Sequence, residues 1–239
     1  MALPKLELPR HKTNLPSDGR EIIMRPYTVK EEKLLLLALE SQDAEQITMA
    51  ISTLIEACIE TELDMSELAG FDIEKIFLEL RGISVGEKIS LNAKCAHCED
   101  HHTEVSIDIK DVGISDWNPD DKIIKLSDSV GITMMHPTTK TLLKMSGEHG
   151  IETVEGIMEL IIACVQNIFD EENVYKATND NQDEIKEFVE GLSTEQFKHV
   201  GNFFNTMPML KYDLDFICSN EKCKKENKIE LRGLQSFFT

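Results

Sequence analysis

The sequence is poor in aromatic residues and in basic ones. Phe, Trp and Tyr make up 6% of its 239 residues, and 25 Lys and Arg residues stand against 44 Asp and Glu residues, so the formal net charge at pH 7 is −19. Such a chain repels nucleic-acid phosphates unless its cations form a separate stripe. Its main basic cluster, between Lys222 and Lys228, is interleaved with glutamates. We therefore expect a solvated loop there and no nucleic-acid partner.

Long apolar runs are missing as well. The longest, Leu34 to Leu39, has six residues, whereas a membrane-spanning helix needs about 20. The segment Met1 to Leu6 lacks the apolar stretch of a signal peptide. The sequence therefore favours neither membrane insertion nor export, and we expect no membrane partner.

The motifs of common enzymes are absent too. The sequence contains no G-x-x-x-x-G-K or G-x-G-x-x-G phosphate-binding loop, no H-E-x-x-H zinc motif and no G-x-S-x-G nucleophile turn. Adjacent carboxylates such as Asp120 and Asp121 carry no signal in so acidic a chain. We therefore expect no catalytic residues, no organic cofactor and no small-molecule substrate, and the protein is predicted not to be an enzyme.

Six cysteines are present, and two of them lie on predicted helical stripes. The apolar residues that precede Cys58 at helical spacing are Ile47, Ala50, Ile51, Leu54 and Ile55. Similar spacing surrounds Cys164, in a helix expected to run from Thr153 to Ile168. Because a free cysteine on such a stripe behaves as a small hydrophobic residue, we expect both to be core residues.

The other four cysteines form two pairs, Cys95-x2-Cys98 and Cys218-x4-Cys223. Alternating apolar and polar residues flank each pair, which predicts two β-hairpins with the cysteines at their turns. Two such turns can supply the four sulfurs that a tetrahedral Zn²⁺ requires, and disulfides are not the default without an export signal. We therefore predict one structural zinc ion bound by Cys95, Cys98, Cys218 and Cys223.

Two alternatives to this zinc site remain open from the sequence. The four cysteines could be free thiols on exposed hairpins, although exposed thiols oxidise easily. A histidine could also replace one cysteine as a ligand, since His97, His101 and His102 lie close to the first pair. Four sulfurs already complete a closed site, however, and a closed site indicates a structural metal rather than a catalytic one.

The spacing of the two pairs suggests how the chain is organised. About 120 residues separate them, against about 15–20 in a simple zinc ribbon, so a folded segment should be inserted between the hairpins. We predict an N-terminal hairpin and helical part over residues 1–88 and a first zinc-knuckle hairpin over 89–110. An inserted, mostly helical part over 111–209 and a second zinc-knuckle hairpin with a C-terminal tail over 210–239 complete the prediction.

Local signals define the N-terminal part. Asp18-Gly19 predicts the turn of a β-hairpin, and Thr28-Val-Lys-Glu31 is a capping box that starts a helix through about Ser41. Because the leucines from Leu34 to Leu39 leave this helix little polar face, we expect it to be central and buried. The predicted fold is α+β and helix-dominated, with short β-hairpins and two zinc-knuckle hairpins closing one zinc-ribbon-like site.

The N-terminal third resembles a known family. Residues Leu15 to Ser41, in which Pro26-Tyr-Thr-Val-Lys-Glu-Glu-Lys33 precedes the leucine run, are similar to the baseplate hub proteins of T-even-type contractile-tailed bacteriophages. So is the segment Phe71 to Glu87, which precedes the first cysteine pair. The resemblance is firmest from Lys12 to Cys98 and continues more loosely to the C-terminus. It implies a protein of the baseplate hub or of its assembly pathway, which acts through contacts with other baseplate or tail proteins.

Three roles follow from these features. The first is a structural component of the baseplate, made in the host cytoplasm and kept in the virion. The second, in the same family, is a transient hub assembly factor that is absent from the mature virion. A nucleic-acid-binding zinc-ribbon module is a distant third, because the net charge disfavours it. Phe237 and Phe238, near the C-terminus, are candidate anchors for a protein partner.

Overall fold

The chain folds into two units, and the first is assembled from segments far apart in the sequence. The computed structural model describes residues 6–41, 43–148 and 153–237. Unit 1 comprises Met1–Met65, Phe71–Ser115 and Met209–Thr239, and unit 2 comprises Ser66–Gly70 and Asp116–Pro208. The four-part division expected from the sequence stays a prediction, because packing alone does not show which segments fold independently.

Unit 1 begins with the β-hairpin that the sequence predicts. Strands β1 (His11–Asn14) and β2 (Glu21–Met24) pair antiparallel. Gly19 in their turn has a φ of +76°, a left-handed conformation that glycine adopts without strain. The elements that follow along the chain are helices α1 (Val29–Ser41) and α2 (Ala44–Cys58), the 3₁₀ turn η1 (Met65–Glu67) and helix α3 (Gly70–Ser84).

One ion pair ties the start of α1 to its neighbours. Glu31 accepts the backbone N–H of Thr28 at 2.7 Å, as the predicted capping box requires, and Arg25 Nη2 lies 3.1 Å from Glu31 Oε1. Arg25 also donates to the carbonyl of Ala57 at 2.7 Å, so the pair joins the ends of β2 and α2 to α1. Burial opposes ionisation of Glu31, but hydrogen bonds from Thr28 and Arg25 outweigh it and lower the pKa of Glu31 to about 2.

Helix α1 is not the buried central helix that we expected. Only Leu35 and Ala38 of α1 are buried, whereas Leu34, Leu36 and Leu37 are 50%, 52% and 53% exposed. Successive helical residues point about 100° apart, so consecutive leucines cannot all face one neighbour. Helix α1 packs mainly against α2, and that contact covers one side of α1 and leaves the other open.

Helix α3 holds the C-terminal segment of the chain in place. Its Glu74 accepts the backbone N–H groups of Leu210 at 3.1 Å and of Leu234 at 2.9 Å. Burial raises the pKa of Glu74, although these two hydrogen bonds oppose the shift. Gly233 has a φ of +66°, and a Cβ atom there would lie 3.3 Å from Glu74 Oε1. This turn therefore favours glycine, both for its backbone conformation and for its close approach to α3.

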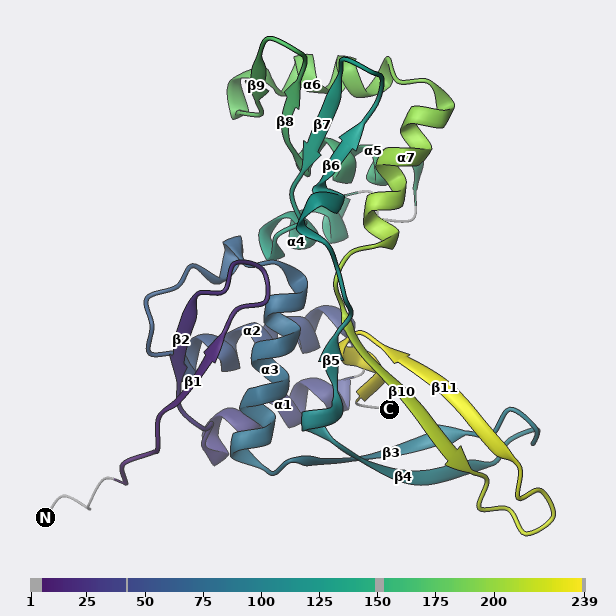
Figure 1. The fold of residues 1–239 in the computed structure, drawn as a ribbon. Helices are drawn as coiled ribbons and strands as arrows, with labels where there is room; N and C mark the ends of the chain where they lie inside the picture. Colours follow the sequence, from purple (N-terminus) through teal and green to yellow (C-terminus); the bar gives the residue numbers. More distant parts are fainter. Residues whose placement is uncertain (1–5, 42, 149–152, 238–239) are drawn as a thin grey trace, which may run out of the picture. The chain divides into compact units, whose positions relative to one another are not determined.

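Two long β-hairpins complete unit 1. Strand β3 (Lys88–Lys94) pairs antiparallel with β4 (His102–Asp108), and β10 (Leu210–Ile217) with β11 (Glu226–Arg232). Strand β10 also pairs with the short β5 (Gly113–Ile114), so this sheet has the order β11-β10-β5. The two hairpins can be followed in Figure 1, where β10 and β11 are the yellow end of the chain.

The core of unit 1 lies between these hairpins and α3, and it includes the C-terminal tail. Inward-facing residues of β3, such as Ile89 and Leu91, pack in one cluster with Leu78 of α3. Phe237, in the 3₁₀ turn η5 (Leu234–Phe237), belongs to the same cluster and is 1% exposed. The expectation that Phe237 anchors a partner is therefore wrong, and Phe238 lies outside the described residues.

Unit 2 is a four-stranded antiparallel sheet packed against helices. Its strands, in spatial order, are β6 (Ile123–Lys125), β7 (Gly131–Met134), β8 (Val165–Phe169) and β9 (Val174–Lys176). Its helices are α4 (Thr139–Glu148), α5 (Val154–Ala163), α6 (Gln182–Glu190) and α7 (Thr194–Asn205). Apolar residues of α5, α6 and α7 form one cluster with Ile132 and Met134 of β7. In the described residues the fold is thus α+β, with seven helices and small antiparallel sheets.

The predicted helix from Thr153 to Ile168 is too long. Helix α5 ends at Ala163, Cys164 closes it with its N–H 3.1 Å from the carbonyl oxygen of Leu160, and Val165 begins β8. The apolar residues beyond Cys164 still match helical spacing, and periodicity alone does not locate the change to a strand. Cys58 and Cys164 are both fully buried, which confirms that they are core residues.

The burial of Phe237 predicts a large effect on stability. Changing Phe237 to Ala removes a buried ring from the core of unit 1 and should lower the free energy of unfolding by about 3–5 kcal/mol. Ile217→Ala is the matched control, because Ile217 lies in the same unit and is 61% exposed; it should change stability by less than about 0.5 kcal/mol. Urea unfolding of both variants measures the difference. Equal effects would contradict the packing of the tail.

Candidate metal centre

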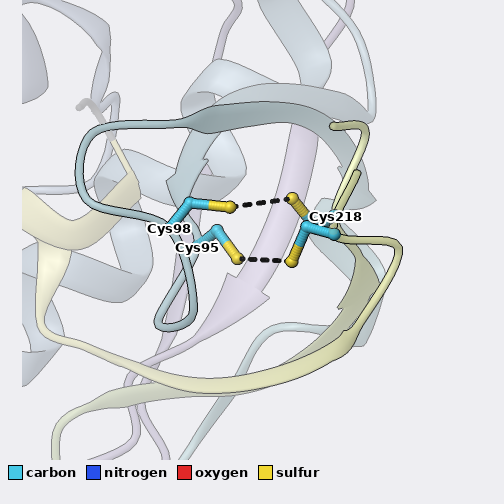
Figure 2. Close-up of side chains that lie close together, drawn as sticks. Cys95, Cys98 and Cys218 are labelled. Carbon is cyan, nitrogen blue, oxygen red and sulfur yellow. Dashed lines mark hydrogen bonds between the residues drawn. The ribbon is translucent and has the colours of Figure 1, made fainter. Parts of the chain in front are cut away.

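The four paired cysteines lie at the turns of the two long hairpins. Cys95 and Cys98 follow β3, and Cys218 and Cys223 follow β10. Figure 2 shows the side chains of Cys95, Cys98 and Cys218 turned toward one another between the two turns. The cysteines converge because the β3–β4 hairpin and the β10–β11 hairpin have their turns at the same end of unit 1.

The spacing of the sulfur atoms suits a tetrahedral metal ion. All four Sγ atoms lie within 4.8 Å of one another, with 3.9 Å between Cys95 and Cys223 and 3.9 Å between Cys98 and Cys218. A Zn–S bond of about 2.3 Å places the sulfurs of a tetrahedral site about 3.8 Å apart. The same distances are much longer than a disulfide bond, which is about 2.05 Å. The sulfurs thus stand where a metal ion could be bound by all four.

The histidines near the first turn do not join this cluster. His101 Nε2 lies 2.8 Å from the hydroxyl of Ser219, and His97 and His102 are exposed. Cys95 and Cys218 are buried, while Cys98 and Cys223 are partly exposed. Among the described residues of this region, the four cysteine sulfurs are therefore the atoms that lie close enough together to bind one metal ion.

The two turns are built alike, as if related by a two-fold axis. The N–H of Cys95 bonds to the carbonyl of His101 at 2.9 Å, and that of Cys218 bonds to the carbonyl of Lys225 at 3.0 Å. In the first turn the backbone N–H of His97, two residues after Cys95, also donates to the Cys95 sulfur at 3.4 Å. N–H donors of this kind stabilise thiolates, which are the form that binds metal.

Reciprocal hydrogen bonds join the two turns. The N–H of Ala96 donates to Asn227 Oδ1 at 2.9 Å, and the N–H of Ser219 donates to Thr103 Oγ1 at 3.0 Å. Each donor directly follows the first cysteine of its own hairpin, and each acceptor lies on the returning strand of the other hairpin. Thr103 and Asn227 are both buried. They fix the position of the two turns relative to each other, as partners beyond the ligands of metal sites do.

The pKa values of the thiols show that the cluster resists further negative charge. Burial opposes ionisation of Cys95, but hydrogen bonds from the His97 N–H and neighbouring side chains outweigh it and lower the pKa of Cys95 to about 7. Burial and neighbouring thiols raise the pKa of Cys98 to about 12, and burial also raises that of Cys218. One thiolate is thus favoured and further ones are opposed. A divalent cation would reverse this preference, because a coordinating thiol is deprotonated.

Unit 2 has no comparable cluster among its described residues. A groove of about 720 Å³ lies along α4, α5 and α6. Its charged residues form long, exposed ion pairs, such as Lys140 with Glu67 at 3.8 Å and Lys186 with Glu190 at 4.0 Å. Such pairs are typical of a solvated surface. In the described part of the chain, no helix is long and apolar enough to cross a bilayer.

Comparison with known protein families identifies the family to which the chain belongs. The family model of the T4 bacteriophage base plate protein matches residues 8–239, which is nearly the whole sequence. Neither the curated proteins nor the solved structures that were compared give a match. The family is that of phage baseplate structural proteins, and this chain belongs to it. The match to this baseplate family therefore covers segments of both units.

The cross-hairpin bonds predict that Asn227 supports metal binding without being a ligand. Asn227→Ala leaves the Ala96 N–H without its acceptor and loosens one turn, so zinc affinity should fall about 10–100-fold. Asn92→Ala, at an exposed position of β3, should leave the affinity unchanged. Competition with a chromogenic zinc chelator measures both. If the two variants bind zinc equally well, Asn227 does not position the site.

Proposed function

We propose that the protein is a non-enzymatic structural component of the phage tail baseplate, located in its hub region and held in the mature virion. The observation that carries this proposal is the family match over residues 8–239. The first part of the chain also resembles hub proteins in particular, from Lys12 to Cys98. Its partners in this proposal are other baseplate or tail proteins, with no role for nucleic acid, membrane or a small-molecule substrate.

We further propose that Cys95, Cys98, Cys218 and Cys223 hold one structural Zn²⁺ and thereby close a zinc-ribbon-like site. Sulfur spacing, the matching turns and the absence of histidine from the grouped ligand atoms support this assignment. Four thiolates in tetrahedral geometry suit zinc or iron. Zinc fits a structural role because it has no redox chemistry. Bound zinc can contribute on the order of 10 kcal/mol of apparent binding energy, and here it would lock together two hairpins distant in sequence.

The transient hub assembly factor remains the second candidate. It belongs to the same family and would make similar protein contacts, but it would be absent from the finished particle. The nucleic-acid-binding module is disfavoured by the net charge of −19, because the strands next to the metal centre carry acidic residues among their lysines. Lys228, for example, lies 3.5 Å from Asp215 across β10 and β11.

The metal assignment predicts about one zinc ion per purified chain. The double variant Cys218→Ser with Cys223→Ser should lose the zinc and unfold at a lower temperature. Cys164→Ala, a buried cysteine outside the cluster, should keep the zinc and cost about 1–2 kcal/mol through a small cavity. Elemental analysis by mass spectrometry measures the content. Iron in place of zinc, or unchanged zinc in the double variant, would contradict the proposal.

The proposed role predicts that the protein is present in purified phage particles at a fixed ratio to other baseplate proteins. Quantitative mass spectrometry of intact particles and of isolated baseplates measures this ratio. Enrichment in the central hub over the peripheral parts supports the hub location. Absence from mature particles, together with presence in assembly intermediates, would overturn the structural role in favour of the assembly factor.

A further inference from the structure

The outward face of α1 carries more exposed apolar surface than a solvated helix requires. On this face Leu36 and Leu37 are half-exposed and Val29, in the first turn, is 79% exposed, while the half-exposed Leu34 lies to one side of it. Scattered exposed apolar residues are ordinary, but a group of them on one element marks a surface that binds something. The opposite side of α1, with Leu35 and Ala38, is already used against its own unit.

Two charged residues share this outward face. At about 100° per residue, Val29, Lys33, Leu36, Leu37 and Glu40 all fall within about 100° of the helix circumference. Lys33 and Glu40 are both exposed, and neither takes part in an ion pair among the described residues. They lie seven positions apart, which is too far for the three- or four-residue spacing at which helical side chains pair.

The placement of these charges has a symmetry of its own. Lys33 and Glu40 lie at equal distances on either side of the point between Leu36 and Leu37. If a second identical helix is laid antiparallel about that point, Lys33 of each helix comes level with Glu40 of the other. Leu36 of each comes level with Leu37 of the other in the same way. This is the condition of a self-complementary two-fold interface, in which residue i meets residue j and residue j meets residue i.

We infer that the α1 face, defined by Val29, Lys33, Leu36, Leu37 and Glu40, binds the same face of a second copy of this chain. The apolar residues supply the buried surface, and the two Lys33–Glu40 pairs fix the antiparallel register. The small area of a single helix pair makes the association weak and concentration-dependent. A high local concentration, such as an assembling baseplate provides, would favour it.

The net charge of the chain opposes this association without preventing it. Two copies at −19 each repel one another, but at physiological ionic strength charges more than about 8 Å apart are largely screened. The α1 face itself carries one cation and one anion, with the exposed Lys30 at its edge. The local attraction therefore acts at contact, while most of the repulsion acts at longer range and is weakened by salt.

Sedimentation equilibrium of the full, zinc-loaded chain tests the inference. Between about 1 and 100 μM, the weight-average mass should rise from that of one 27.1 kDa chain toward twice that value. Leu37→Asp should weaken the dimer at least about tenfold. Lys33→Glu, which turns two attractive contacts into two repulsive ones, should also weaken it about tenfold.

The charge exchange is the decisive variant. Lys33→Glu combined with Glu40→Lys restores opposite charges at both contacts and should recover the wild-type dimer constant. Val85→Lys is the matched control, since Val85 is an exposed apolar residue of the same unit, and it should have no effect. Circular dichroism verifies that each variant keeps its helices. A chain that stays monomeric over the whole range overturns the inference, as does a dimer that ignores Leu37→Asp or an exchange variant that fails to recover.

Discussion

The convergence of four thiols from two hairpin turns constrains the whole of unit 1. The turns are about 120 residues apart in the sequence, and they meet only because the chain returns to β10 after completing unit 2. Strand β10 pairs with β5 on one side, and Glu74 of α3 accepts a hydrogen bond from the backbone N–H of Leu210. The core cluster that includes Leu78 and Phe237 packs between α3 and the two hairpins. Each of these contacts brings the second turn to the first.

The two ends of unit 1 present different surfaces. At the hairpin end, the side chains of Thr103 and Asn227 accept hydrogen bonds from the opposite turn. The sulfur atoms lie between the two turns (Figure 2). These hydrogen bonds hold the two turns together around the four grouped sulfurs. The helical end is open, since α1 presents leucines to solvent.

Local signals predicted what depends on a few neighbouring residues, and they failed where distant contacts decide. Asp18-Gly19 and the Thr28–Glu31 capping box each act within one turn of the chain, so the first hairpin and the start of α1 were predictable. The cysteine pairs were recognisable because metal ligation demands a fixed spacing. The switch from helix to strand after Cys164 and the burial of Phe237 depend on residues far away in the sequence. The exposure of Leu36 depends on which side of α1 is covered by α2. Thr103 and Asn227 could have been found only by noticing that they occupy equivalent places on the two hairpins.

The pairing of β5 with β10 determines how the connections at Ser115 and Met209 respond to tension. The chain leaves unit 1 just after Ile114 and comes back just before Leu210, and these residues are direct partners at one end of the strand pair. Ser115 and Met209 continue the pairing, with a backbone bond of 2.9 Å. A force carried by these two connections would load the Ser115–Met209 bond first and the next pair only after it had broken. The junction would open like a zipper, bond by bond at low force, whereas strands pulled from opposite ends resist together. Tension on these two connections would therefore separate β5 from β10 before it reached the paired strands of the long hairpins.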